Sequence, residues 1–135
     1  MPRKFGWLAP SGNFIECGVH EHIDAVMNSE EMMSVPKVAE ILNQLDEMEK
    51  EFAEFAAREG SSNAEWHLYE IACDNAIPKI VKHLYRAKYL RVGETEDCLH
   101  FEGFPNVIKS RYQECKDFAE QFGMAAVFEP QREPC

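Results

Sequence analysis

The chain has 135 residues and a mass of 15.5 kDa, which is the size of one domain, and its apolar content of 45% is that of a globular protein. It carries 24 acidic and 14 basic residues, and the resulting net charge of −10 disfavours general binding to nucleic acid or to an anionic membrane. No apolar run approaches the roughly 20 residues that a membrane span needs. Five scattered cysteines argue against a disulfide framework, so we expect a protein of the reducing cytosol.

The first predicted element is a β-hairpin over residues 4–17. Phe5 and Trp7 alternate on its first strand, and the link 10–13 (Pro-Ser-Gly-Asn) consists of turn formers. A helix is expected to follow over about 20–33, where apolar residues recur with helical spacing.

The clearest pattern is that of a long amphipathic helix, which we expect to start at Ser34 as the N-cap and to end near Arg58, before Gly60. Six apolar residues recur along it in steps of three and four and define an apolar seam: Val38, Ile41, Leu45, Met48, Phe52 and Phe55. The outer side carries an acidic face, which is expected to stay in water and which includes Glu40, Glu47, Glu51 and Glu54. The seam predicts either a homodimer interface or packing against the next helix in an αα-hairpin.

Two further helices are predicted in the middle of the chain. Ser62 and Glu65 have the spacing of a capping box and would open the first of them, which carries Trp66 and Leu68 on its apolar stripe. Pro78 is expected to end this helix and to begin a short one that stops near residue 87.

The last third of the chain predicts a second hairpin and a final helix. A strand over 89–92, a polar turn over 93–97 and a return strand over 98–102 follow from alternation and turn composition. Pro105 is expected to open a helix that ends at Gly123.

A short strand over 124–128 is possible, and residues 129–135 are expected to form a mobile tail. The sequence therefore predicts a single α+β domain over residues 1–128. Its antiparallel sheet would be formed by two β-hairpins side by side, with four or five helices on one face.

The spacing of Cys17, His20 and His22 predicts a zinc site, because thiolate and imidazole are the ligands that zinc prefers. With such a site the chain would be a zinc-binding module or a zinc-dependent enzyme, as an alternative to an interaction protein that is not an enzyme. Cys98 and His100 could approach these residues if the two hairpins pair. Cys17 could instead act as a nucleophile, with its pKa lowered by the adjacent helix N-terminus. The alternative is a structural cysteine with two histidines at a helix entry, and in that case no cofactor is bound.

A local basic stripe follows in a chain that is otherwise acidic. Lys79, Lys82 and Arg86 have helical spacing, Arg91 lies close in sequence, and no acidic residue occurs between Asp74 and Glu94. Such a stripe could hold a phosphorylated small molecule or an acidic partner, or it could be an ordinary exposed helix face.

The opening residues 5–17, Phe-Gly-Trp-Leu-Ala-Pro-Ser-Gly-Asn-Phe-Ile-Glu-Cys, resemble small proteins encoded by bacteriophages and prophages that begin with a G-W-[LI]-x-P-x-G hairpin. The resemblance covers about the first 25 residues and part of 80–122, and residues 88–89 lack the Gly-Trp that is usual at the second hairpin. It implies an accessory role in the host cytosol and no transferable activity. The leading hypothesis is a small acidic interaction protein that binds a host or phage protein and inhibits a host system. It would act through nucleic-acid mimicry by the acidic face or through docking of the apolar seam, as a homodimer or alone.

Overall fold

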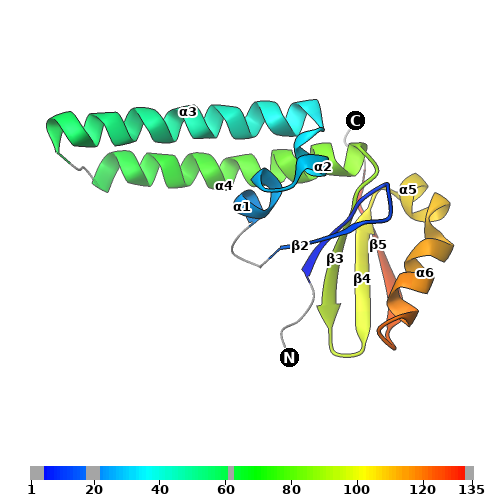
Figure 1. Ribbon diagram of the computed structural model, residues 1–135. Coiled ribbons are helices and arrows are strands. Elements are labelled where there is room, and N and C mark those ends of the chain that lie inside the picture. The colour runs from blue at the N-terminus through cyan, green and yellow to red at the C-terminus, as the bar shows by residue number, and fades with distance from the viewer. Residues whose placement is uncertain (1–4, 18–21, 61–62, 133–135) are drawn as a thin grey trace.

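The computed structural model describes residues 5–17, 22–60 and 63–132, with the backbone alone at His22 and over 63–65. These residues form five strands in one sheet and six helices, which confirms the predicted α+β class. Figure 1 shows two long helices that run side by side and reach out beyond the sheet, while the short helices lie close to it. No helix in the described ranges combines the length and the apolar content needed to cross a bilayer.

The sheet has the strand order β2-β1-β3-β4-β5. β1 (Phe5–Leu8) forms the predicted hairpin with β2 (Phe14–Glu16) and pairs antiparallel with β3 (Leu90–Thr95), so the two hairpins lie side by side as expected. β4 (Cys98–Gly103) is the antiparallel partner of β3. β5 (Ala125–Pro130) joins the far edge of the sheet and runs parallel to β4.

The turn of the second hairpin is shorter than predicted. β3 continues to Thr95, and only Glu96 and Asp97 separate it from β4, so the expected polar turn over 93–97 is wrong. Glu96 has a φ of 32°, as a tight two-residue hairpin requires at a central position. The cross-strand ladder to β4 extends the strand through residues whose composition alone suggested a loop.

The expected helix over 20–33 is two helices, α1 (His22–Met27) and α2 (Glu30–Met33). Ser29 lies between the two helices with an extended backbone, and its side chain accepts a hydrogen bond of 3.2 Å from the Met32 N–H. An N-cap of this kind satisfies a donor that a short helix would otherwise leave unpaired.

The long amphipathic helix is confirmed as α3 (Pro36–Glu59), and Gly60 ends it with a φ of 88°. Its start differs in detail, because Val35 and not Ser34 is the N-cap residue. Ser34 instead closes α2, where its hydroxyl donates to the Glu31 carbonyl. These two residues, Ser34 and Val35, turn the chain from α2 into α3.

The predicted break at Pro78 is wrong, because α4 (Asn63–Arg86) continues through it as one helix. A proline inside a helix removes one backbone hydrogen bond, here the one that would end on the Asp74 carbonyl. Both residues are exposed, so water can reach the carbonyl left without its helical partner. The predicted capping box stays a prediction, because Ser62 lies outside the described residues and the side chain of Glu65 is not described.

The final helix is also divided, into α5 (Pro105–Ser110) and α6 (Tyr112–Glu120). Arg111 lies between them with a φ of −112° and a ψ of 14°, and its side chain is buried. The prediction of one helix from Pro105 to Gly123 is therefore wrong, because the backbone at Arg111 leaves helical geometry and its side chain turns into the protein.

Helices cover parts of both faces of the sheet rather than one face as expected. Phe101 packs edge-on against Phe118 of α6, with ring centroids 6.3 Å apart. The opposite face carries Trp7, whose ring lies 5.8 Å from that of Tyr85 near the end of α4. The largest fully buried side chains come from both the strands and the helices and include Trp7, Leu8, Met32, Leu42, Ile80, Leu84, Leu90, Leu99 and Phe101.

The end of β5 overlaps the tail that the sequence predicts over 129–135. Glu129 and Pro130 belong to the strand, and the Gln131 N–H donates a 2.7 Å hydrogen bond to the Gly103 carbonyl. Residues 133–135 lie outside the described residues.

Candidate interaction surface

The distal half of the α3–α4 pair is held together by an aromatic cluster. Phe52 lies with its ring centroid 6.4 Å from that of Trp66 and 6.3 Å from that of Tyr69. The Tyr69 hydroxyl donates a 3.4 Å hydrogen bond to Glu49 on the facing helix. The seam residue Phe52 is therefore used inside the chain, in the αα-hairpin that was one of the two predicted arrangements.

The rest of the predicted seam is divided between the interior and the surface. Val38 and Leu45 are buried, as is Leu42, which the predicted seam omits. The other seam residues, Ile41, Met48 and Phe55, are half-buried. With Gln44, Asn75 and Lys79, Ile41 and Met48 line a shallow groove of about 290 Å³ between the two helices.

Apolar side chains remain exposed on α4. Leu68 is 59% exposed and Ile71 is 42% exposed, although Leu68 was predicted to lie on the apolar stripe of its helix. The two residues are three positions apart and thus neighbours on one helix face. Large apolar side chains left in water next to each other mark a surface that another molecule can cover.

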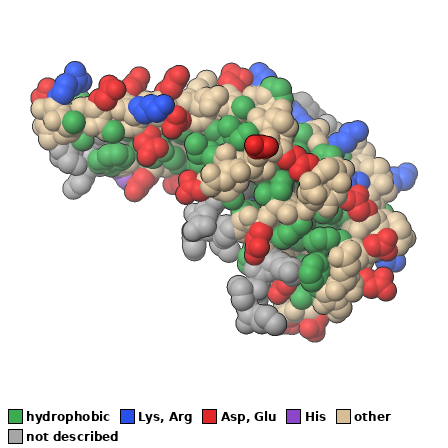
Figure 2. Space-filling view, viewed as in Figure 1, with side chains coloured by type: hydrophobic (Ala, Val, Ile, Leu, Met, Phe, Trp, Pro, Cys, Tyr) green, Lys and Arg blue, Asp and Glu red, His purple; other side chains and the backbone are tan. Residues whose placement is uncertain are grey.

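The exposed apolar pair lies within the most acidic part of the protein. From Asp46 to Asp74 the chain has nine acidic and two basic residues, so this segment carries a formal charge of −7 out of −10. The predicted acidic face is exposed throughout, at Glu40, Glu47, Glu51 and Glu54. Figure 2 shows acidic side chains along the projecting helices, with hydrophobic side chains between them. We call residues 46–74 the acidic tip.

The other end of α4 has the opposite charge. Lys79 and Arg86 are exposed and Lys82 is half-buried, and five basic residues with no acidic one lie between Asp74 and Glu94. Burial lowers the pKa of His83, and the positive charges of Arg86 and Lys82 lower it further. The helical hairpin is therefore negative at its tip and positive at its base.

Arg91 does not join this basic stripe. It lies on the sheet, with its guanidinium carbon 5.8 Å from the ring centroid of Trp7. The four residues predicted to hold a phosphorylated molecule are thus divided between a helix face (Lys79, Lys82, Arg86) and the face of the sheet that carries Trp7.

A polar network lies farther along the same face of the sheet. The imidazole of His100 is hydrogen-bonded through Nε2 to Thr95 Oγ1 at 2.6 Å and through Nδ1 to Glu129 Oε1 at 3.0 Å. Burial raises the pKa of the Glu102 carboxyl, and the neighbouring carboxyl of Glu129 raises it further. Because Thr95, His100 and Glu129 come from β3, β4 and β5, the network fixes the register of three adjacent strands.

The predicted zinc residues are only partly described. Cys17 is half-buried, His20 lies outside the described residues and the side chain of His22 is not described, so this site stays a prediction. His100 and Cys17 lie on one face at the same level of the sheet, but β1 and β3 separate their strands by about 14 Å. Cys17 and His100 therefore do not come together, although the sequence suggested that the two clusters could converge. The described residues contain no group of three or more His, Cys, Asp or Glu side chains that could hold a metal ion.

A reactive thiol at Cys17 receives no support from its surroundings. Burial raises the pKa of the Cys17 thiol above its ordinary value, with a smaller opposing effect of Arg91. This is the opposite of the lowering that the sequence suggested. At a given pH a raised pKa leaves less of the nucleophilic thiolate.

Comparison with protein-family models, with curated proteins and with solved structures found no match. The surfaces of the protein itself are therefore the basis for a functional proposal.

Proposed function

We propose that the protein acts by protein–protein interaction, with the acidic tip docked on a basic surface of a partner protein. The observation that carries the proposal is the exposure of Leu68 and Ile71 within a segment of charge −7. An apolar centre surrounded by charged residues is the arrangement that protein interfaces use. The negative charge of the acidic tip requires a partner surface that is positively charged.

The two parts of this surface have different effects on binding. Burying a Leu or Ile side chain from water contributes about 1.5–3 kcal/mol when the burial is complete. The exposed carboxylates of Glu47, Glu51 and Glu54 contribute mainly to the association rate and to the choice of partner, and salt screens their effect. Binding should therefore be sensitive both to apolar truncation and to ionic strength.

Nucleic-acid mimicry is the form of this proposal in which the basic surface normally binds DNA or RNA. The phage-type origin, the host cytosol and the inhibition of a host system follow from the sequence resemblance and remain predictions. A second copy of the chain is an alternative occupant, because the basic base of one hairpin could face the acidic tip of another.

The experiment compares three forms of the full chain as bait in a host-cell lysate. The first variant combines Glu47→Gln, Glu51→Gln and Glu54→Gln, and the second combines Leu68→Ser with Ile71→Ser. The matched control neutralises three carboxylates elsewhere, with Glu96→Gln, Asp97→Asn and Asp117→Asn, all of which are exposed.

We expect the wild type and the control to retain the same basic protein, and both tip variants to lose it with unchanged melting temperatures. Retention should also fall between about 0.05 and 0.3 M salt. Equal retention by all forms would contradict the proposal. Sedimentation analysis of the wild type separates the alternative, because a homodimer that the tip variants dissociate would assign this surface to a second copy.

A further inference from the structure

β5 is an edge strand whose outer side is open in the described part of the chain. It pairs with β4 on one side and ends the strand order on the other. The residues from Met124 to Phe128 carry no charge, and the only proline, Pro130, comes at the end of the strand. Proteins commonly protect an edge strand with charged residues or proline, so this edge is suited to pairing with another strand.

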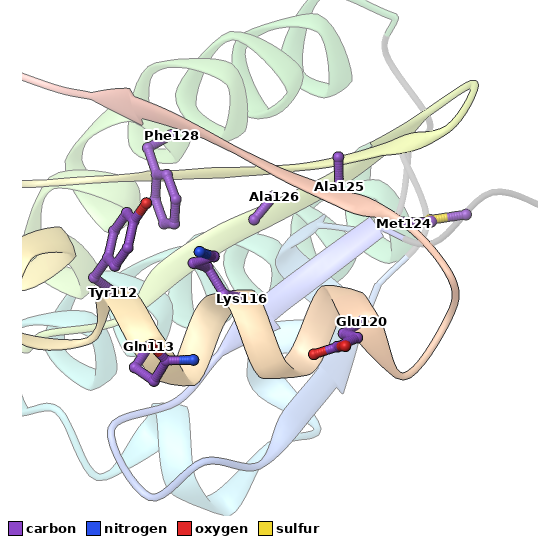
Figure 3. A pocket seen from close by; sticks show the side chains of 8 residues that line it. All are labelled: Tyr112, Gln113, Lys116, Glu120, Met124, Ala125, Ala126 and Phe128. Atoms are coloured by element: carbon purple, nitrogen blue, oxygen red, sulfur yellow. The ribbon is translucent and has the colours of Figure 1, made fainter.

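A groove of about 480 Å³ runs along this edge, between β5 and α6. Figure 3 shows Tyr112 and Lys116 of α6 extending toward the strand, and Glu120 lines the groove farther along the same helix. The ring of Tyr112 is stacked on that of Phe128, with centroids 4.8 Å apart and an interplanar angle of 27°. Lys116 extends over Tyr112, with Nζ 5.4 Å from the ring centroid, and no carboxylate among the described residues forms an ion pair with it.

The spacing of these α6 residues matches that of an added strand. Tyr112, Lys116 and Glu120 are four residues apart, which is about 6 Å per step along a helix. Every second residue of a strand points to the same face, about 6.8 Å from the last. Three successive side chains on one face of an added strand would therefore lie opposite an aromatic ring, an ammonium group and a carboxylate.

We propose that the β5 edge and the α6 groove bind an extended peptide segment of a partner protein as a sixth strand. The segment has an apolar, an acidic and a basic side chain at alternate positions, opposite Tyr112, Lys116 and Glu120. Main-chain hydrogen bonds to β5 supply the affinity, and the three side chains supply the specificity. This site is separate from the acidic tip and does not depend on the function proposed for it.

The charges of the groove disfavour a second copy as the occupant. An antiparallel β5 from another copy would present Ala126 and Phe128 to the groove, because these residues line it in the first copy. Its carboxylate at Glu129 would lie on the other face of the sheet, where it is bonded to His100. The added strand would then present no acidic side chain to Lys116, whereas a peptide of the stated pattern supplies one.

The probe is a seven-residue peptide with blocked ends, Ser-Phe-Thr-Asp-Thr-Lys-Ser, used with the full chain. A charge-swapped peptide exchanges its Asp and Lys, and a third peptide has the residue order reversed to allow either strand direction. Fluorescence anisotropy measures affinity, and hydrogen exchange measures the protection of backbone amides. The test variant is Lys116→Glu, and Lys109→Glu on the exposed side of α5 is the charge-matched control.

We expect the probe in one of its two directions to bind, and to slow exchange at residues 125–130. Lys116→Glu should weaken this binding about tenfold and should remove the preference for the probe over the charge-swapped peptide, while Lys109→Glu should leave both affinities unchanged. The proposal is overturned if no peptide of the panel binds, if the swapped peptide binds the wild type equally well, or if Lys116→Glu changes nothing. Concentration-dependent protection of 125–130 without peptide would give the edge to a second copy and would equally overturn it.

Discussion

Arg111 and Glu114 form a bidentate ion pair at the junction of α5 and α6. Nε of Arg111 donates to Glu114 Oε1 at 2.9 Å, and Nη2 donates to Oε2 at 2.7 Å. The same guanidinium also donates to the backbone carbonyls of Leu8, Ala9 and Lys88 at 3.2, 2.6 and 2.9 Å. The Arg111 side chain therefore links the end of β1 to the loop between α4 and β3. The carboxylate of Glu114 balances the positive charge of the buried guanidinium.

Removal of this guanidinium should strongly destabilise the fold. Arg111→Met removes a hydrogen-bond donor from three backbone carbonyls and the ion-pair partner from Glu114. We expect the free energy of unfolding to fall by about 3 kcal/mol in urea denaturation. Lys109→Met removes an exposed charge two residues away and should change the free energy of unfolding by less than about 0.5 kcal/mol. Equal effects of the two substitutions would show that the buried contacts of Arg111 contribute little.

Pro78 should be an unfavourable residue in α4. A proline in a helix interior is about 3 kcal/mol less favourable than alanine, offset by up to about 1 kcal/mol because it restricts the unfolded chain. Since its side chain is exposed, Pro78→Ala creates no cavity. We expect the free energy of unfolding to rise by about 1–3 kcal/mol. A loss of stability would mean that the proline is needed for the shape of the hairpin.

Leu42 should contribute more to the stability of the fold than Phe55, the last residue of the predicted seam. Its side chain is fully buried, and truncation of a buried leucine to alanine typically costs about 2–5 kcal/mol. Phe55 is half-buried near the end of α3, so Phe55→Ala should lower the free energy of unfolding less than Leu42→Ala. The reverse order in denaturation experiments would contradict the packing described for α3.

Glu102 should make stability depend on pH in a definite direction. Its carboxyl has a pKa raised above its ordinary value of 4.5, so the folded state binds the proton more readily than the unfolded state. The free energy of unfolding therefore falls as pH rises through the window from the ordinary to the raised pKa.

The matching variant is Glu102→Gln, which can still accept the hydrogen bond from Tyr85. It should be more stable than the wild type at pH 7, and the difference should shrink as pH falls through this window and level off below about 4.5. Thermal melts of both proteins over this range provide the measurement. A difference that grew on acidification would show that the carboxylate is stabilised and not penalised in the fold.

The sequence predicts those features that local patterns determine. Alternation at Phe5 and Trp7 and the periodicity from Val38 to Phe55 correctly give the first hairpin and the long helix. The sequence fails where tertiary contacts override local preference. Pro78 stays inside a helix because α4 packs along α3, and the break at Arg111 depends on carbonyls more than 100 residues away in sequence at Leu8 and Ala9.

The surfaces were only partly predictable for the same reason. The acidic face follows from composition and helical period, but the exposure of Leu68 requires knowledge of which side of α4 meets α3. The groove beside β5 had a signal in the sequence, namely the four-residue spacing of Tyr112, Lys116 and Glu120 before an uncharged strand. That signal has meaning only when the strand is known to lie at the sheet edge.

The central claim is that the acidic tip is the surface that meets a partner. Carbodiimide labelling of the carboxylates, carried out on the free protein and on the complex recovered with its basic partner, tests this most directly. We expect labelling at Glu47, Glu51 and Glu54 to fall in the complex, while Glu96 and Asp117 keep the reactivity that they have in the free protein. Unchanged labelling of the three tip carboxylates, with loss at the other two, would contradict it.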